Sequence, residues 1–426
     1  MKTNLIKQTF YELRTQKVAS TVTIVGTAMA IFLIMMVMMI DRSATAPFAP
    51  ESNRSRTLHG MYLHTMSVDG RGVNNSGSMN IKSARRIYEG LEGVECVSYY
   101  TLWNERIDAE QPGHAPVVIY RKYVDDNFWK VFDHTFLAGK PFEPSTIDGN
   151  DKVVILSEDA VRDIMGVSPA EAIGQTVKVG QEARRVSGVI ASASPLASIA
   201  FSQAFVPSSA KTDSWGPYHG EFAAAILMKP ETDEEDVRAQ VRQCFDEYSL
   251  EMKAAGDSAV YHGQPFTQEV VKNAGQWGSN STPDVTEGRR KKAVIILLLM
   301  LVPAVNMSAM TQSRLKRRVA EMAIKRAYGA TKQRLLAEIL VENLLLTLVG
   351  GMIGLVLSLV GALILGDVVF SGSGFTGVDI DINLDIIFSW SLFGVALAAC
   401  FILNLLAAGV PAWRASHASP ADALRG

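Results

Sequence analysis

The most constraining feature of this sequence is a strongly basic stretch that runs directly into a long apolar one, over residues 314–365. The basic part contains eight Lys and Arg residues, opposed only by Glu321 and Glu338. The apolar part, from about residue 339, has one ionisable residue, Glu342, and exceeds the roughly 20 residues that a helix needs to cross a bilayer. Because Lys and Arg beside a span are retained on the cytoplasmic side, the stretch predicts a cytoplasmic loop that leads into a membrane helix.

Gly329 divides the basic loop into two parts. Glycine adopts positive φ angles at no steric cost and interrupts helices. The pattern therefore predicts a short amphipathic helix, a turn at Gly329-Ala330-Thr331, and a new helix that enters the membrane.

Other apolar runs, at residues 18–40 and 293–310, predict further membrane helices. The first, residues 18–40, is 23 residues long and uncharged. A cleaved signal peptide is the alternative, since Ala44-Thr45-Ala46 imitates a cleavage site. However, Pro47 follows at once, and the run exceeds the roughly 7–15 apolar residues of a signal peptide, which favours a retained anchor. The second run contains Pro303, which predicts a kink.

The charges beside these runs predict the topology. The segment 367–385 contains four Asp and no Lys or Arg, which places it outside the cytoplasm, and both termini then lie inside. Lys and Arg are normally found on the cytoplasmic side, which is the positive-inside tendency. Four consecutive cations, at 289–292, lie on the predicted outer side and oppose this tendency. The tendency does not govern a translocated loop of about 250 residues. These cations are therefore predicted to meet lipid phosphates or to belong to a solvated stalk helix.

The predicted fold class is a membrane protein with four transmembrane α-helices and a large α+β periplasmic domain, of one or two lobes, between the first two. The predicted segments are an amphipathic interfacial helix at 1–17, a first span at 18–40, the periplasmic domain at 41–288, a second span with a basic end at 289–311, a cytoplasmic coupling loop at 312–337, a third span at 338–366, a short periplasmic loop at 367–385, a fourth span at 386–410 and a cytoplasmic tail at 411–426.

The third span carries a small residue at every fourth position. Such a ridge lets another helix approach closely, and the alternative is a span that merely tolerates glycine. Polar amides inside spans are expected to face another helix. The predicted packing residues are Gly350, Gly354, Ser358 and Ala362 in the third span, Asn306 in the second and Asn404 in the fourth.

Between the first two spans the composition is that of a soluble domain. Residues 44–56 are rich in Pro, Ala and Ser and predict a linker. Alternation and turn residues predict strands at 61–68, 94–103, 116–124, 153–156, 176–179, 184–190, 204–206 and 223–228, and helices at 81–91, 158–165 and 232–250.

Sequence motifs for chemistry are missing from the chain. It contains no phosphate-binding G-x-x-x-x-G-K-[ST] loop, no nucleophile elbow, no CxxC and no HExxH, and its seven histidines are scattered. We therefore expect no catalysis, no cofactor and no metal site in this chain. The net charge of −2 and the lack of a basic, aromatic patch argue against nucleic-acid binding. Cys96 and Cys244 either pair or are two unrelated buried thiols.

The segment EMAIKRAYGATKQRLLAEILVENLLLTLVGGMIGLVLS resembles the signature of the FtsX-like, or MacB-type, permease family of ABC transporters. In that family a basic loop precedes a Gly-rich third span. Met322, Ala323 and Tyr328 depart conservatively from the family pattern, which more often has Ile, Gly and an aliphatic residue there. Glu342 matches the family's Glu, and it either pairs with a loop Arg or belongs to an ion pathway.

A second resemblance lies in the soluble region, which is similar to the periplasmic core domain of MacB-like permeases. The matching positions are aromatic residues and turn glycines that determine a fold and imply no chemistry. They are Phe128, Phe132, Gly139, Lys140, Phe142, Ala172-Ile173-Gly174 and Gly188, and the tail matches the family at Pro411, Ala412, Ala415, Pro420, Ala423, Leu424 and Arg425.

The resemblance implies a permease subunit of the inner membrane that is driven by a separate ABC ATPase, which binds the ATP. It also implies a second permease copy or a sister permease, contact with lipids, and a possible periplasmic adaptor or outer-membrane component. The expected activity is export of a drug, peptide or lipoprotein, with FtsX-like control of a cell-wall hydrolase, without transport, as the alternative. The expected contacts with the ATPase are Glu321, Lys325, Arg326, Ala327, Tyr328, Gly329, Ala330 and Thr331.

Overall fold

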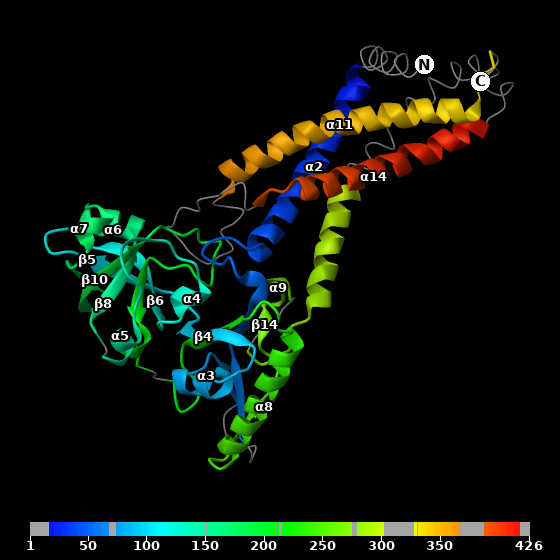
Figure 1. The fold of residues 1–426 in the computed structure, drawn as a ribbon. Helices are drawn as coiled ribbons and strands as arrows, with labels where there is room; N and C mark the ends of the chain where they lie inside the picture. The colour runs from blue at the N-terminus through cyan, green and yellow to red at the C-terminus, as the bar shows by residue number, and fades with distance from the viewer. Residues whose placement is uncertain are drawn as a thin grey trace. The chain divides into compact units, whose positions relative to one another are not determined.

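The computed structural model describes residues 17–67, 74–149, 151–212, 215–274, 279–301, 328–329, 331–366 and 387–417. The chain forms two compact units (Figure 1). We call them the helical unit, which comprises Met1–Ser43, Arg290–Ser371 and Ile382–Gly426, and the sheet unit, which comprises Ala44–Arg289 and Gly372–Asp381.

Two long apolar helices dominate the described part of the helical unit. α2 (Lys17–Thr45) and α11 (Lys332–Ile364) contain apolar segments of 26 and 21 residues, long enough to cross a bilayer. α14 (Trp390–His417) contains a shorter apolar segment. Another helix covers 285–301, and it starts where the Asp284 carboxylate accepts a hydrogen bond from the Glu287 N–H (3.0 Å).

The helix that contains most of the fourth predicted span extends beyond it. The sequence analysis placed this span at 386–410 and began a tail at Pro411, whereas α14 begins at Trp390 and continues through Pro411 to His417. Proline lacks the N–H of a helical turn, but membrane helices tolerate it because neighbouring groups satisfy the freed carbonyl. The predictions for 1–16, 302–327, 367–386 and 418–426 lie outside the described residues.

Eleven of the described strands of the sheet unit form one sheet, in the order β11-β8-β10-β9-β5-β6-β4-β12-β1-β14, with β7 paired to β10. β11 also pairs in parallel with β6, so the strands from β11 to β6 close into a ring. The strands are β1 (Thr57–Gly60), β4 (Val94–Thr101), β5 (Glu105–Glu110), β6 (Val117–Val124), β7 (Phe136–Gly139), β8 (Val153–Ser157), β9 (Thr176–Val179), β10 (Glu182–Ile190), β11 (Ala204–Pro207), β12 (Phe222–Met228) and β14 (Phe266–Thr267).

Short helices connect and cover these strands. α6 (Glu158–Met165) carries two acidic residues in its first turn and ends at Gly166, which has a left-handed φ of +65°. The other helices are η1 (Arg54–Arg56), α3 (Ile81–Tyr88), α4 (Phe128–Val131), α5 (Pro144–Asp148), α7 (Pro169–Ala172), η2 (Ser208–Ala210), α8 (Glu234–Lys253) and α9 (Gln268–Asn273).

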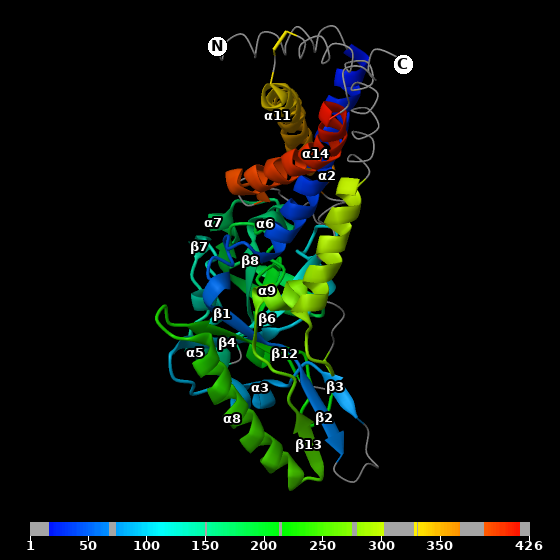
Figure 2. The same ribbon diagram turned by 90° about the vertical axis from the view of Figure 1, so that its right-hand side faces the viewer.

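A second, three-stranded sheet lies beside α8 (Figure 2). It consists of β2 (Leu63–Ser67), β3 (Asn75–Gly77) and β13 (Asp257–Val260), in the order β13-β2-β3. Met61 and Tyr62 join β1 of the large sheet to β2 of the small one. On the return path, residues 261–265 join β13 to β14, so that two antiparallel strand pairs are linked by two short segments.

The aromatic residues that the second resemblance identified form a core of the sheet unit. Phe128, Phe132 and Phe142 are buried, and the rings of Phe128 and Phe132 are 4.6 Å apart. Gly139 has a φ of +71°, and a Cβ there would lie 2.2 Å from the Ser187 carbonyl oxygen. Only glycine allows β7 to approach β10 this closely.

The linker predicted at 44–56 was wrong, because these residues form part of the folded sheet unit. Glu51 and Arg54 are only 3% and 4% exposed, and Phe48 and Glu51 form a β-bridge. A high content of Pro, Ala and Ser indicates a linker only when no buried partner orders the segment, and here the partners come from residues 196–200.

Candidate functional site

The structure describes only part of the predicted coupling loop. Tyr328 and Gly329 form a turn, Gly329 has a φ of +90°, and α11 begins three residues later at Lys332. The Tyr328 side chain is 89% exposed, and Thr331 is exposed as well. A large aromatic side chain is therefore presented to its surroundings immediately before a membrane-length helix. Glu321, Lys325, Arg326, Ala327 and Ala330 lie outside the described residues.

The small-residue ridge of α11 lies against α2. A Cβ at Gly350 would be 2.8 Å from the Thr27 Cβ, and one at Gly354 would be 2.7 Å from the Ala28 carbonyl oxygen. Backbones approach this closely only where side chains are missing, as in small-residue helix contacts in membranes. The Ser358 hydroxyl donates to the Gly354 carbonyl (2.7 Å), so this polar group is satisfied within α11.

Other predicted packing residues occupy different environments. Ala362 is fully buried. Asn404 lies within α14, and Asn306 falls outside the described residues. The neighbouring glycine Gly351 lies against α14, since a Cβ there would be 2.5 Å from the Leu397 side chain. α11 therefore contacts both α2 and α14, and Gly351 also lies near Ile31 of α2.

α2 and α11 cross each other, and their chains run in the same sense (Figure 1). Gly350 lies beside Ile24 and Thr27, whereas Gly361, eleven residues further on, lies beside Phe32. The contacts thus advance along both helices in the same direction. If both helices cross the membrane in the same direction, the chain must cross back an odd number of times between them. The helix at 285–301 overlaps the predicted second span, which would make one such crossing.

The basic cluster at 289–292 is partly neutralised. The Lys292 ammonium forms an ion pair with Asp41 near the end of α2. Within the sheet unit, the Arg289 guanidinium pairs with Glu269 (2.7 Å). Carboxylates of the protein itself therefore balance at least two of the four cations that oppose the positive-inside tendency.

A buried ion pair orders the segment that follows α2. The Arg54 Nε donates to the Glu51 carboxylate (2.7 Å), and its two terminal nitrogens donate to the carbonyls of Ala46 (2.6 Å) and Leu196 (3.0 Å). The other Glu51 oxygen accepts from the Ile199 and Ala200 N–H groups, both at 2.9 Å. Burial alone would raise the pKa of Glu51, but Arg54 and the Ala200 N–H hold it below its usual value.

The loop 194–201 binds side chains from distant parts of the sheet unit. Lys122 on β6 is fully buried, and its ammonium donates to the Ile199 carbonyl. Lys272 on α9 donates to the Ser198 hydroxyl (2.5 Å), and Asn104 donates to the Phe201 carbonyl (3.1 Å). Burial lowers the pKa of Lys122 to about 7. The loop is thus fixed by polar side chains rather than by a ladder of strand pairing.

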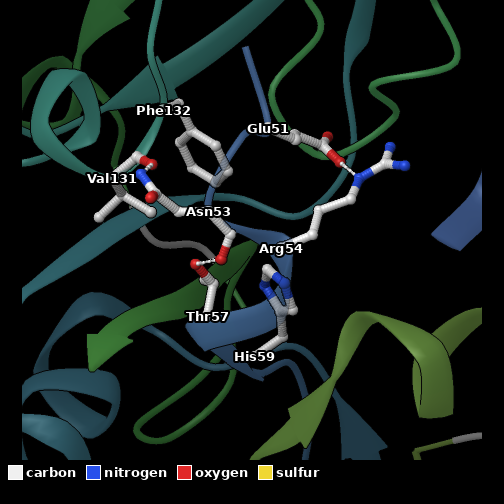
Figure 3. Close-up of a pocket in the computed structure, with 7 residues that line it drawn as sticks. All are labelled: Glu51, Asn53, Arg54, Thr57, His59, Val131 and Phe132. Carbon is white, nitrogen blue, oxygen red and sulfur yellow. Dashed lines mark hydrogen bonds and ion pairs between the residues drawn. The ribbon is translucent and has the colours of Figure 1, made fainter. Parts of the chain in front are cut away.

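A small pocket lies beside this ion pair (Figure 3). Its cavity volume of about 10 Å³ is room for about one water molecule, so it is too small for a drug-sized molecule. His59 lies in its wall, and burial lowers the pKa of this histidine to about 4. The lining residues are Glu51, Asn53, Arg54, Thr57, His59, Val131 and Phe132.

Cys96, Cys244 and Cys400 are free thiols, and the candidate pairing of Cys96 with Cys244 is not formed. Among the described ranges, no three His, Cys, Asp or Glu residues are grouped to hold a metal ion. The sequence analysis did not identify Glu51, Arg54 or Lys122, because no local pattern shows that a charged residue will be buried by a segment far away in the chain.

Two family models match the chain. A model described as the MacB-like periplasmic core domain matches residues 20–244, which is more than half of the chain. A model described as the FtsX-like permease C-terminal domain matches residues 293–420. The first covers α2 and most of the sheet unit, and the second covers the basic loop, α11 and α14.

Individual relatives are distant. The macrolide export ATP-binding/permease protein MacB of Escherichia coli K12 is 24% identical over 241 residues, which cover 55% of this chain and 34% of that protein. This chain thus matches about a third of the length of MacB. YknZ of Bacillus subtilis, an ABC transporter permease, is 21% identical over 348 residues, which cover 79% of this chain and 77% of YknZ.

Solved structures of outer domains also match. The periplasmic region of MacB from Actinobacillus actinomycetemcomitans matches 51% of this chain and 91% of that structure, with 13% identity and a TM-score of 0.36. The extracellular domain of YknZ matches 47% of this chain and all of that domain, with 13% identity and a TM-score of 0.32. On the two family models, the chain belongs to the family of ABC transporter permeases that combine a MacB-like periplasmic core domain with an FtsX-like permease domain.

Proposed function

We propose that this chain is the permease subunit of a MacB/FtsX-type ABC transporter and that it transmits ATP-driven movement from a separate cytoplasmic ATPase to its periplasmic domain. The chain itself hydrolyses no ATP in this proposal and binds no cofactor. The proposed activity is export of a drug, a peptide or a lipoprotein. Two copies, or one copy and a sister permease, form the transporter in the inner membrane, and an adaptor or outer-membrane component completes the path.

The shared chain direction of α2 and α11 is the observation that carries this proposal. If α2 crosses outward from the cytoplasm, α11 crosses outward as well, and a span between them must return the chain to the cytoplasm. The helix at 285–301 and the apolar residues that follow it supply this span. The basic loop 312–337 is then cytoplasmic, and with α14 the topology has four spans and two cytoplasmic termini.

The turn at Tyr328 and Gly329 supports the coupling role of this loop. In this proposal the turn before α11 passes a displacement of the loop to that helix, and the ridge at Gly350 and Gly354 passes it on to α2. The exposed Tyr328 ring offers an aromatic contact to a partner, and aromatic residues are enriched at such interfaces. Lys325 and Arg326 would pair with acidic groups of the ATPase.

Purification of the full-length chain from its own host in mild detergent tests the proposal. We expect an ABC-type ATP-binding protein to co-purify in near-equal amount, and we expect Lys325→Glu/Arg326→Glu to abolish this association. Lys82→Glu/Arg106→Glu, which reverses two exposed cations of the sheet unit, is the matched control. If no ATP-binding protein associates, or if the loop variant binds as well as the control, a sensor or regulator without transport replaces the permease.

Cysteine labelling tests the topology separately. In a background without Cys96, Cys244 and Cys400, Lys316→Cys and Phe375→Cys are exposed to a membrane-impermeant maleimide. We expect labelling at 375 in intact cells and labelling at 316 only after permeabilisation. Labelling at 316 from outside would overturn the four-span arrangement.

A further inference from the structure

The two short segments that join the small sheet to the large one lie side by side. Residues 61–62 lead from β1 to β2, and residues 261–265 lead from β13 to β14. β1 pairs with β14, and β2 pairs with β13. The two strand pairs would form one long antiparallel hairpin, except that pairing stops at the two segments, which lie opposite each other. The angle between the two sheets therefore depends in part on this pair of segments, beside the core that Leu63 and Ala259 share with the large sheet and α8.

Side chains hold the two segments together where strand pairing stops. The Gln264 amide oxygen accepts from the Met61 N–H (2.6 Å) and the Tyr62 N–H (2.9 Å), and its nitrogen donates to the Tyr62 carbonyl (2.8 Å). Gly60 is required here, because a Cβ would lie 2.2 Å from the Tyr88 ring. Gln264 thus replaces a missing backbone partner at the point where the ribbon bends.

A hydrogen bond between two histidines joins the two segments at the end nearest the small sheet. His64 Nδ1 and His262 Nε2 are 2.9 Å apart, the ring centroids are 5.2 Å apart, and the rings are within 10° of parallel. Nearly parallel rings in a face-to-face stack would be separated by roughly 3.5 Å or more. The rings therefore meet edge to edge in one plane, and the two nitrogens share a single proton in an N–H···N hydrogen bond.

A third histidine holds the same strand. The His219 Nε2 lies 3.1 Å from the Leu63 carbonyl oxygen, which can only accept, so this nitrogen carries the proton. Burial lowers the pKa of His219, and His64 adds to the effect. Burial and then His64 also lower the pKa of His262. Three histidines thus meet around the start of β2, and His64 and His262 share one proton between their facing nitrogens.

The remaining charges near the segments do not favour further protonation. On α8, the Arg242 guanidinium lies 4.4 Å from the Tyr261 ring and pairs with Asp246, while Arg238 lies 5.8 Å from the Phe266 ring and pairs with Glu234. β13 contributes Asp257 at its far end, and residues 75–77 of β3 carry no charge. A second proton on the histidine pair would make both facing nitrogens donors and set two cations head-on.

We propose that residues 60–64 and 261–265 form a hinge between the two sheets, and that the His64–His262 hydrogen bond locks it. With one shared proton the lock is closed. With two protons the nitrogens repel, the segments separate, and the small sheet moves relative to the large one. The inference concerns the sheet unit alone and does not depend on the transport role.

Hydrogen exchange of the full chain in detergent, at about pH 7.5 and about pH 5.5 and corrected for intrinsic exchange, tests the hinge. We expect the protection of the β2 and β13 amides to fall about tenfold at the lower pH, while β4 and β12 stay unchanged. In His64→Gln/His262→Gln, the amides keep a hydrogen bond but cannot take up a proton, so the pH effect should disappear. His262→Gln alone serves if the double variant does not fold.

His114→Gln is the matched control, since His114 is exposed on the loop between β5 and β6. This variant should keep the full pH effect. Equal protection of β2 and β13 at both pH values would overturn the hinge, and so would a glutamine variant that keeps the pH dependence. Parallel loss of protection in β4 and β12 would also overturn it, because the whole unit would then be opening.

Discussion

The two units of this protein are held together by different means. In the helical unit, α2 and α11 touch through glycines, and a Cβ added at Gly350 or Gly354 would lie 3.0 Å or less from a backbone oxygen of α2. In the sheet unit, the segment after α2 is fixed by buried charges at Glu51, Arg54 and Lys122. A lipid-exposed helix pair gains no hydrophobic energy by associating and relies on close packing. A soluble domain can bury a charge, provided that every polar atom finds a partner. The difference predicts that the two units fail under different substitutions.

Removal of one partner from the buried ion pair should have the largest effect. Arg54→Met leaves the Glu51 carboxylate buried without its cation, which costs about 3–5 kcal/mol. Arg86→Met is the control, because Arg86 pairs with Glu251 at the surface and exposed pairs contribute about 0–1 kcal/mol. Urea denaturation of the full chain in detergent, followed by tryptophan fluorescence, measures both. If the two variants lose similar stability, the buried pair does not organise the sheet unit as we describe.

Acid should weaken the sheet unit and leave the helical unit unchanged. Burial lowers the pKa of His59 to about 4 and that of His134 to about 3. Below pH 6.5 the unfolded chain binds protons at these histidines and the folded chain does not, so the free energy of unfolding falls with pH. The loss by pH 5 is about 2 kcal/mol for each histidine.

The contribution of the histidines is isolated by comparison between variants. Asp125, whose pKa burial raises to about 7, changes stability in the opposite direction over the same range. We therefore compare unfolding between pH 7 and pH 5 for the parent chain and for His59→Gln and His134→Gln. Each variant should show a shallower dependence on pH than the parent. An unchanged slope would mean that these histidines titrate normally.

A bulky side chain on the ridge should break the helical unit alone. Gly354→Leu places its side chain against the Ala28 carbonyl and Ile31 and should cost about 1–3 kcal/mol as the helices separate. Gly26→Leu on α2 is the matched control, since a Cβ there meets no heavy atom of the described residues within 4 Å. Thermal unfolding in detergent distinguishes the two. A larger loss at Gly26 than at Gly354 would place the α2–α11 contact elsewhere.

The sequence analysis succeeded where the signal is local. α6 and β9 have the predicted bounds, because charged or turn residues lie directly at their ends. β5 was missed, since its sequence ERIDAE is highly charged and becomes a strand only by pairing with β6 and β9. The predicted turn at Gly329 and the new helix after it are also observed, because the positive φ of this glycine ends one segment just before α11 begins at Lys332.

The buried polar groups could not be predicted, because their partners are distant in sequence. Glu51 contacts Ile199 and Ala200 nearly 150 residues away, and His64 contacts His262 nearly 200 residues away. Composition alone made the segment around Glu51 resemble a linker. Periodicity identifies which face of an element is apolar, but it carries no information about which polar residues meet across the fold.

The smallest effect is expected where the helical unit uses a charge rather than close packing. Lys292 and Asp41 form an ion pair, but their side chains are 36% and 42% exposed, so Asp41→Asn should cost at most about 1 kcal/mol. The loss should vanish in high salt, because exposed charges are screened. Thermal unfolding in detergent at low and high ionic strength, with Asp126→Asn as a control in the sheet unit, measures it. A loss that is large and independent of salt would show that the helical unit also depends on a desolvated charge pair, and the contrast between the two units would then fail.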